Sequence, residues 1–320
     1  MLKNMEKSSA IKLLDKAYVI PGATNVGLIA SGKTKKAWNL YLIDSGMNDE
    51  DAERIYNEIC LLFPDEKGGF CLKAIINTHS HADHAGGNAF FQKKCGCKIY
   101  ISSGEAGSIM NPWLQGAVFS GGNPLPELSG SYHQCKASIP DKILTKDSVI
   151  ELCQNAKISF IDLKGHYFDM LGVKYTDRNG KTMLFTGDAF FGREHIMKYW
   201  IPYLYDVGKF KESLERLNST NCNYYIPSHG TILNRIQETI ELNTIAILST
   251  EHSVLHILEK KAMSVEELVK EVADLNCIRM KNAQYFLITT TIKSYLTYLF
   301  HLGKIKYETV DNKMTWSIVK

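Results

Sequence analysis

The stretch NTHSHADHAGGN, from Asn77 to Asn88, decides the fold. Within six residues it carries His79, His81, Asp83 and His84. It follows an apolar segment, CLKAIINT (71–78), that predicts a strand. A tight turn at a strand end can aim the first two histidines at one cation, and the aspartate and third histidine at a neighbouring cation, because zinc-type sites use imidazole and carboxylate. A solvated, histidine-rich loop without function is the alternative, and ligands elsewhere in the chain decide against it.

Short apolar runs on both sides of this stretch alternate with a helical pattern. Runs rich in β-branched and aromatic residues predict strands at 26–30, 38–44, 71–78, 98–102, 158–163 and 181–188. The segment DEDAERIYNEICLLF (49–63) has apolar residues at helical spacing and follows a polar start suited to a cap, which predicts a helix. Glycines and prolines interrupt residues 103–135, which predicts a long loop that is functional or mobile. Together these patterns predict an α/β layered domain.

After about residue 236 the pattern changes. Helices are predicted at 236–259, 264–275 and 283–303. Ser264 and Glu267 stand in the spacing of a capping box at the start of the second helix. The segment IKYETVDNKMTWSIV (305–319) then predicts two strands around a turn. Helices followed by a hairpin are typical of a winged helix, so we expect a catalytic domain at 1–238 and a small winged-helix-like α+β domain at 239–320.

Length and composition limit the class of protein. The 320 residues are 45% hydrophobic, enough for one large core and a smaller one. A formal net charge of +3 is small for this length, so no overall basic field points to nucleic acid. No window reaches the roughly eighteen apolar residues of a membrane span, and the N-terminal residues mix charges. The eight cysteines are thinly spread, which predicts reduced thiols and a cytoplasmic protein.

The histidine-rich stretch resembles the signature of the metallo-β-lactamase superfamily, and the resemblance extends over most of residues 15–235. It implies a four-layer αββα sandwich. Three later segments match the contexts in which that family carries its remaining ligands. These segments are LKGHYFDMLG with His166, LFTGDAFF with Asp188 and YYIPSHGT with His229. Each residue alone would be an ordinary loop histidine or turn former, and their common order supports the set.

The resemblance also implies roles for these residues. It assigns His79, His81 and His166 to one metal ion, Asp83, His84 and His229 to a second, and Asp188 to both. The implied cofactors are two divalent ions, zinc or alternatively iron or manganese. Ions about 3.5–4 Å apart would make a bridging hydroxide available near neutral pH. Asp83 and Asp188 are the candidate catalytic residues, and Asp44 in YLIDSG either supports the ligand loop or forms a plain turn.

The resemblance implies a hydrolase that acts on an ester, thioester or lactone bond of a small molecule, with glyoxalase II as the nearest mechanistic relative. A metal domain followed by a winged helix also resembles the beta-lactamase-like protein 2 group, whose members are linked to RNA cleavage. A metal-dependent endoribonuclease or phosphodiesterase is therefore the alternative, and a regulator with a vestigial metal site is a third hypothesis. The charges of the C-terminal segment are about balanced, which favours packing, substrate guidance or a homodimer over binding of nucleic acid.

Further residues are candidates for contact with substrate. His166 is followed by bulky Tyr167 and Phe168 where the family has small residues, which predicts a narrower choice of substrate. Aromatic residues that either wall a pocket or belong to the core are Trp113, Phe119, Tyr199, Trp200, Tyr203 and Tyr205. His195 either contacts substrate or is structural.

Overall fold

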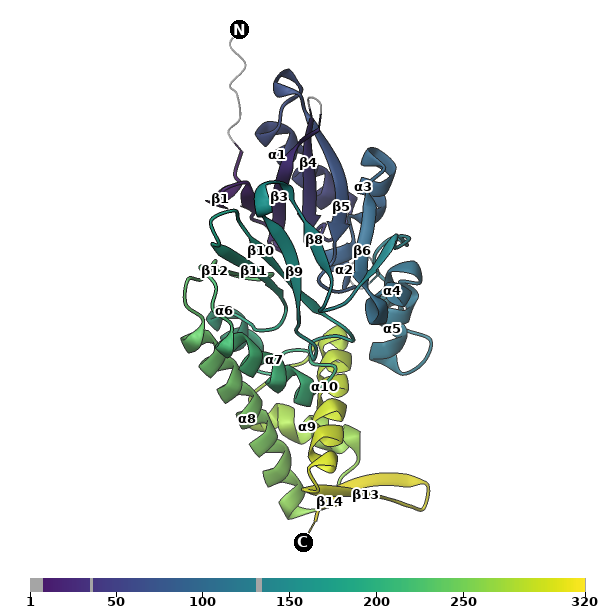
Figure 1. Cartoon of the computed structure of the whole chain (residues 1–320). Coiled ribbons are helices and arrows are strands. Elements are labelled where there is room, and N and C mark those ends of the chain that lie inside the picture. Colours follow the sequence, from purple (N-terminus) through teal and green to yellow (C-terminus); the bar gives the residue numbers. More distant parts are fainter. Residues whose placement is uncertain (1–7, 35–36, 131–133, 320) are drawn as a thin grey trace. The chain divides into compact units, whose positions relative to one another are not determined.

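The computed structural model describes residues 8–34, 37–130 and 134–319 (Figure 1). Internal contacts divide the chain into two compact units. The first unit comprises Met1–Asp162, Asp169–Asp188 and Asn221–Arg235, and the second comprises Leu163–Phe168, Ala189–Thr220 and Ile236–Lys320. The second unit thus takes in two segments that precede residue 236, and the domain boundary expected at 238/239 stays a prediction.

A mixed sheet supports the first unit. Among the described residues its strands are β1 (Ile11–Leu14), β2 (Ala17–Ile20), β3 (Val26–Thr34), β4 (Ala37–Ile43), β5 (Phe70–Ile76), β6 (Lys98–Ser102) and β7 (Lys142–Leu144). The strands pair in chain order, antiparallel from β1 to β4 and parallel from β4 to β7. Parallel neighbours need crossover connections. Helices in these connections are α1 (Asp49–Leu62), α2 (Ala82–Ala85), α3 (Asn88–Cys95), α4 (Ser103–Met110) and α5 (Trp113–Ser120).

A second sheet faces the first. Its strands are β8 (Val149–Glu151), β9 (Lys157–Asp162), β10 (Leu171–Thr176), β11 (Thr182–Gly187) and β12 (Tyr224–Pro227), in the spatial order β12-β11-β10-β9-β8. Short 3-10 helices lie at Asp65–Lys67, Pro126–Leu128 and Cys153–Asn155. β11 and β12 are parallel, and the other neighbours are antiparallel.

Alternating side chains of the first sheet supply two cores. Leu28 and Leu42 pack with residues of the helices, whereas Ile29 and Ile43 pack with residues of the second sheet. Successive residues of a strand point to opposite faces, so one strand can serve both layers. Sheets flanked by helices confirm the predicted α/β sandwich.

The second unit consists of helices and a small hairpin. Its described elements are α6 (Arg193–Tyr199), α7 (Val207–Ser219), α8 (Gln237–Lys260), α9 (Val265–Leu275), α10 (Asn282–His301), β13 (Ile305–Val310) and β14 (Lys313–Ile318). The predicted capping box of Ser264 and Glu267 is present at α9. Val254, Leu268 and Ile292 bring α8, α9 and α10 into one apolar core. No helix in the described part of the chain has both the length and the apolar character needed to span a bilayer.

The prediction of a long loop at 103–135 is wrong for most of that range. Its described residues contain α4, α5 and the 3-10 helix at Pro126–Leu128, while residues 131–133 lie outside the described part. A Cβ atom at Gly104 would lie 2.5 Å from that of Asp169, and one at Gly116 would lie 2.8 Å from the Leu128 carbonyl oxygen. These glycines therefore allow close packing of helices, a role that their chain-breaking tendency conceals.

Candidate metal centre

The ligand loop begins where β5 ends and passes directly into α2. His81 is the residue before α2, and Asp83 and His84 lie within the single turn of that helix. His79 and His84 are fully buried. A Cβ atom at Gly86 would overlap the carbonyl oxygen of Met47, which leaves only glycine at this position. The ligand loop thus packs closely against the backbone at Met47.

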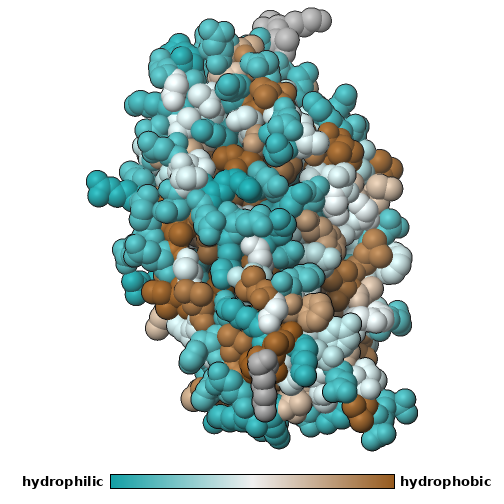
Figure 2. All heavy atoms as spheres, turned by 60° about the horizontal axis from the view of Figure 1, so that its bottom comes forward, coloured by the Kyte–Doolittle hydropathy of each residue, from teal (hydrophilic) through white to brown (hydrophobic). Residues whose placement is uncertain are grey.

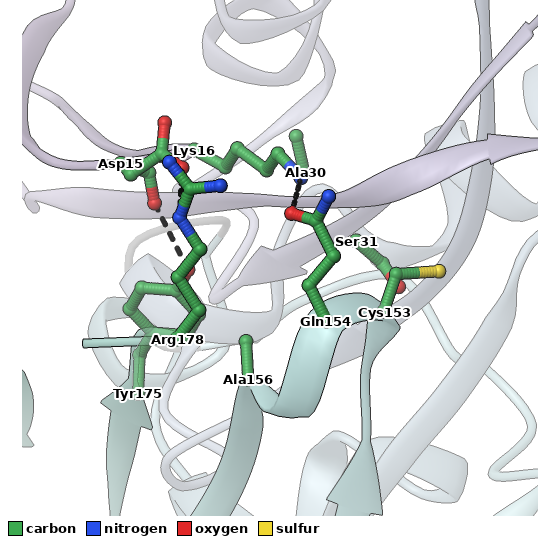
Figure 3. A pocket seen from close by; sticks show the side chains of 9 residues that line it. All are labelled: Asp15, Lys16, Ala30, Ser31, Cys153, Gln154, Ala156, Tyr175 and Arg178. Atoms are coloured by element: carbon green, nitrogen blue, oxygen red, sulfur yellow. Dashed lines mark hydrogen bonds and ion pairs between the residues drawn. The ribbon is translucent and has the colours of Figure 1, made fainter. Parts of the chain in front are cut away.

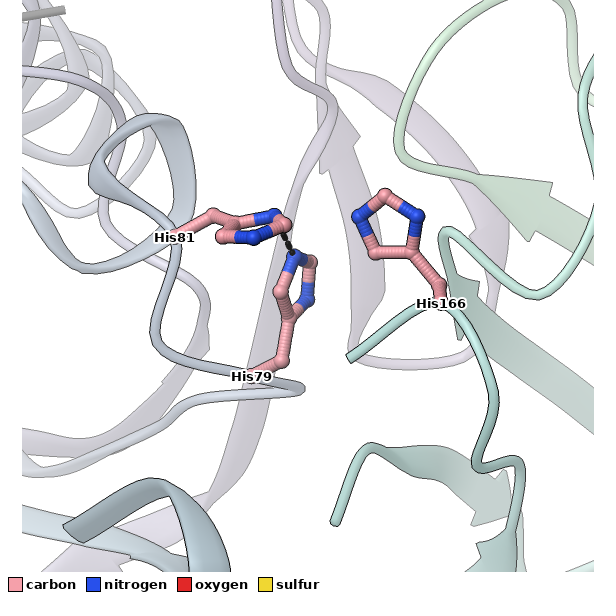
Figure 4. A group of neighbouring side chains, drawn as sticks. All are labelled: His79, His81 and His166. Carbon is pink, nitrogen blue, oxygen red and sulfur yellow. Dashed lines mark hydrogen bonds between the residues drawn. The ribbon is translucent and has the colours of Figure 1, made fainter. Parts of the chain in front are cut away.

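The predicted ligands fall into overlapping groups whose donor atoms lie within 4.8 Å of one another. Among the described residues these groups are His79, His81 and His166; His79, His84 and Asp188; and Asp83, His84 and His229. Figure 4 shows the rings of the first group turned toward one another, with His79 Nε2 and His81 Nδ1 3.0 Å apart. Imidazole and carboxylate groups of this kind suit zinc, iron or manganese. The structure therefore brings together every residue of the predicted set.

Two carboxylates and two imidazoles face one another in this site. Asp83 Oδ2 lies 3.4 Å from His84 Nε2 and 3.1 Å from His229 Nε2. Asp188 lies 3.5 Å from His84 Nε2 and 3.6 Å from His229 Nε2. The buried Nε2 of His84 makes no hydrogen bond within the described residues. This nitrogen faces two carboxylates without a hydrogen bond to either, and a cation held by these donors would satisfy it.

The charges of this group depend strongly on one another. Burial raises the pKa of Asp83, but the imidazoles of His84 and His229 outweigh burial and hold that pKa well below its usual range. Burial lowers the pKa of His229, but the carboxylates of Asp188 and Asp83 raise it to about 12. The carboxylates thus favour cationic charge on the imidazoles. A divalent ion would displace those protons, so its binding would release protons to solvent.

Each of three imidazoles has an acceptor at its outer nitrogen, Nδ1. The acceptors are Asp44 Oδ2 at 2.9 Å for His84, the Ala23 carbonyl oxygen at 2.8 Å for His229, and the Tyr203 carbonyl oxygen at 3.0 Å for His166. A carbonyl oxygen only accepts, so it keeps the hydrogen of the imidazole on Nδ1. The inner nitrogen, Nε2, is then available to a metal ion. Histidines that bind metals commonly donate their other N–H to a carboxylate or a carbonyl oxygen in this way.

The predicted support of the ligand loop by Asp44 is present. Its carboxylate accepts hydrogen bonds from the backbone N–H and the hydroxyl of Thr78, both at 2.8 Å. Asp44 is buried and has a φ of 60°, a left-handed conformation that aspartate adopts more readily than most residues with a side chain. Its hydrogen bonds thus fix the end of β4 to the start of the ligand loop.

Sequence patterns alone did not identify Glu105, which is fully buried in the first turn of α4. Its carboxylate accepts bonds from the Ser80 hydroxyl at 2.5 Å, the Ser80 N–H at 3.1 Å and the Asp169 N–H at 2.7 Å. Burial raises the pKa of Glu105 to about 7, although these bonds oppose the rise. Ser80 stands between His79 and His81, so Glu105 positions the loop that carries them. Its only sequence signal is a charged residue between small ones.

Some of the predicted aromatic residues lie beside the ligands. The Phe119 ring is 6.2 Å from the His81 ring, and the Tyr203 ring is 5.6 Å from the His166 ring. Tyr167 is fully buried, so this bulky residue belongs to the core. His195 stacks on Phe191, with the ring centroids 4.8 Å apart.

A small hollow lies elsewhere in the first unit (Figure 3). Its space of about 220 Å³ includes open solvent, and none of the predicted ligands lines it. Lys16 Nζ donates a hydrogen bond to Gln154 Oε1 at 2.9 Å, and Arg178 Nε lies 3.7 Å from Asp15 Oδ2. The cationic groups of the hollow are thus already paired with polar partners.

The chain matches the model of a known protein family. The model of the metallo-beta-lactamase superfamily matches residues 19–229. A hydroxyacylglutathione hydrolase of Hyphomonas neptunium is 31% identical over 126 residues, which are 39% of this chain and 37% of that protein. The lactamase-like protein nscB of Arthroderma otae is 22% identical over 53% of this chain and 38% of its own length. The chain therefore spans less than two fifths of either curated relative.

Solved structures share the fold at low identity. A beta-lactamase domain protein from Burkholderia ambifaria superposes with a TM-score of 0.74 at 14% identity, over 97% of this chain and 93% of its own. A metallo-beta-lactamase family protein from Thermus thermophilus superposes with a TM-score of 0.67 at 17% identity, over 96% of this chain and 100% of its own. These similarities support the sandwich fold. The function has to be inferred from the side chains of the site.

Proposed function

This chain belongs to the metallo-beta-lactamase superfamily, whose members are generally hydrolases, and from this premise we propose that it is a dinuclear metal-dependent hydrolase of a small ester, thioester or lactone. The observation that carries the proposal is the overlap of the three donor groups. His79 belongs to two groups and His84 to two, so the donors form one continuous site rather than separate ones.

The same overlap supports an assignment of ligands. His79, His81 and His166 would hold one ion, and Asp83, His84 and His229 the other. The third group joins Asp188 to His79 from the first set and to His84 from the second. A carboxylate with one neighbour in each set is suited to bridge both ions, the role proposed for Asp188.

Divalent cations bound there would supply a water molecule of lowered pKa and positive charge that stabilises an oxyanion. The chain's own contribution is orientation. The Thr24 hydroxyl donates to Asp83 Oδ2 at 3.2 Å, which directs this carboxylate while leaving its side chain 23% exposed. Asp83 Oδ2 can therefore orient an attacking water molecule by accepting a hydrogen bond from it. Phe119, beside His81, would exclude water from one side.

The substrate class rests on a partial likeness. The relative from Hyphomonas neptunium is named a hydroxyacylglutathione hydrolase, and an acyl group on glutathione is a thioester. We therefore place thioesters first among the substrates of this chain, before esters and lactones. The described residues include all eight cysteines, each with a free thiol, which supports our proposal that the protein is cytoplasmic.

A metal-reconstitution screen tests the proposed function. Protein loaded in turn with zinc, manganese or iron is assayed on thioesters, esters, lactones, phosphodiesters and single-stranded RNA. We expect hydrolysis of a small acyl substrate that a chelator abolishes and added metal restores. Cleavage of phosphodiesters or RNA alone would replace this proposal with the endoribonuclease alternative. Turnover that survives complete removal of metal would contradict both.

A further inference from the structure

The hairpin of the second unit has one covered edge and one open edge. β13 and β14 pair antiparallel, with Tyr307 opposite Trp316. On the far side of β14, Met263 N–H donates to the Trp316 carbonyl at 3.0 Å, and Trp316 N–H donates to the Met263 carbonyl at 2.8 Å. Met263 therefore covers the outer edge of β14.

The direction of these bonds fixes where the backbone groups of β13 point. Trp316 uses its N–H and carbonyl on Met263, so its pairing with Tyr307 is of the non-hydrogen-bonded kind. The N–H and carbonyl of Tyr307 then point away from β14, and those of Ile305 and Thr309 do the same because directions alternate along a strand. Within the described residues no backbone hydrogen bond uses these groups.

The open edge is exposed and partly apolar. Every residue of β13 after Ile305 is exposed, with Tyr307 at 52% and Val310 at 54%. The Tyr307 ring packs 5.3 Å from Trp316 and 5.4 Å from Phe300, which stiffens the strand. Figure 2 shows hydrophobic residues among hydrophilic ones on the face of the molecule that it displays. An exposed edge of this kind is a template for another strand.

We propose that β13 pairs antiparallel with β13 of a second copy of this chain, about a two-fold axis at Tyr307. In this register Tyr307 faces its counterpart, and Ile305 faces Thr309 of the other copy. The outward N–H and carbonyl groups of both strands then bond to each other, which continues the sheet across the axis. An interface of this kind is isologous, so each contact occurs twice.

Charge selects this register over its neighbours. Lys306 and Glu308 flank Tyr307, and neither side chain forms an ion pair within the described residues. In the proposed register Lys306 of each copy lies opposite Glu308 of the other. A shift to the next hydrogen-bonded register places Lys306 opposite Lys306, or Glu308 opposite Glu308. One of these shifts would also place Lys304 opposite Glu308, but Lys304 is already paired with Glu251 at 2.7 Å. Opposite charges across strands stabilise a pair and like charges destabilise it, so the register centred on Tyr307 is favoured as the one of the three without like charges opposite each other.

Charge reversal tests the proposal directly. Lys306→Glu places glutamates opposite one another twice, and Glu308→Lys does the same with lysines. We expect each variant alone to weaken the dimer about tenfold or more, measured by sedimentation equilibrium of the full chain. An equimolar mixture of the two variants restores opposite charges at both positions. We therefore expect a heterodimer of about wild-type affinity in the mixture.

A control variant and unfolding transitions separate loss of the dimer from loss of folding. Lys281→Glu reverses an exposed lysine just before α10, away from β13, and should leave association unchanged. Unfolding transitions of the single variants should match that of the wild type, because both side chains are exposed. A wild-type chain that stays monomeric at high concentration would overturn the proposal. So would a dimer that neither reversal weakens, or variants that fail to associate when mixed.

Discussion

The ligand loop at 77–88 and the hairpin at 305–318 use polar groups in opposite ways. In the loop, polar atoms are buried and bonded to residues distant in sequence, among them Asp44 and Glu105. In the hairpin, side chains are exposed and the outward backbone groups of β13 have no partner among the described residues. The comparison teaches that the loop is a preorganised site in which substitutions should be costly. The hairpin, in contrast, presents backbone N–H and carbonyl groups that a strand of a second molecule could bind.

Asp188→Asn should have the largest effect, because it removes the charge of the carboxylate that lies between both sets of ligands. We expect kcat/KM to fall by at least about 100-fold, with loss of bound metal. Enzyme kinetics and metal analysis of the same preparation measure both effects. Asp147→Asn, at an exposed aspartate, is the matched control. Full turnover with unchanged metal content in Asp188→Asn would refute the bridging role.

Asp44→Asn should have the next largest effect. It weakens the bonds to Thr78 and to His84 Nδ1 and so loosens the orientation of the loop. We expect metal affinity to fall by about 10- to 100-fold, measured by competition with a chromogenic chelator. The matched change Asp15→Asn, outside the site, should leave the affinity unaltered. Equal metal affinities in the two variants would mean that Asp44 does not orient the metal ligands.

Glu105 makes the stability of the loop depend on pH. Its pKa is raised from 4.5 to about 7 in the folded chain. The folded state therefore holds its proton more tightly than the unfolded state, and this contribution is full below pH 4.5 and lost as pH rises to about 7. The loss amounts to about 3 kcal/mol in the free energy of unfolding.

Glu105→Gln removes this titration, so denaturant unfolding between about pH 5 and pH 8 should show a flatter dependence than the wild type. The variant should also lose activity, because an amide nitrogen cannot accept the bonds that Ser80 and Asp169 donate. Glu66→Gln, at an exposed glutamate, should keep the wild-type slope. A wild-type slope in Glu105→Gln would show that Glu105 does not titrate in this range.

The smallest effect on catalysis is expected at the hairpin. Lys306→Glu should change kcat/KM by less than about twofold, because exposed substitutions away from structural features have small effects. Steady-state kinetics at concentrations below and above the dissociation constant of the dimer measure this. A large loss of activity on dissociation would show that the two regions are functionally coupled.

Much of the fold could be predicted from local patterns. The six predicted strands correspond to β3, β4, β5, β6, β9 and β11, and the predicted helix at 49–63 is α1, capped by Asn48. The hairpin turn was readable because Asp311 and Asn312 tolerate the positive φ that both adopt. These features depend on interactions over a few residues, so they can be predicted from the local sequence.

Contacts between distant residues escaped prediction. In the sequence, Gly104 and Gly116 resemble residues that interrupt helices. The structure shows that they allow close contact with Asp169 and Leu128. Glu105 resembles a surface residue until Ser80 and Asp169 are seen to donate to its carboxylate. The candidate metal ligands could be predicted because their family contexts are distinctive, whereas Gly104, Glu105 and Gly116 stand in no such context. Their positions depend on tertiary packing, which no local pattern encodes.

We propose that the seven donors, from His79 to His229, hold two divalent ions. Metal analysis by inductively coupled plasma mass spectrometry, on protein reconstituted with zinc, iron or manganese and then desalted, tests it most directly. We predict two ions per chain, falling to one or none in His84→Ala, whose imidazole belongs to two of the donor groups. A well-folded chain that retains no ion from any of these metals would contradict the claim.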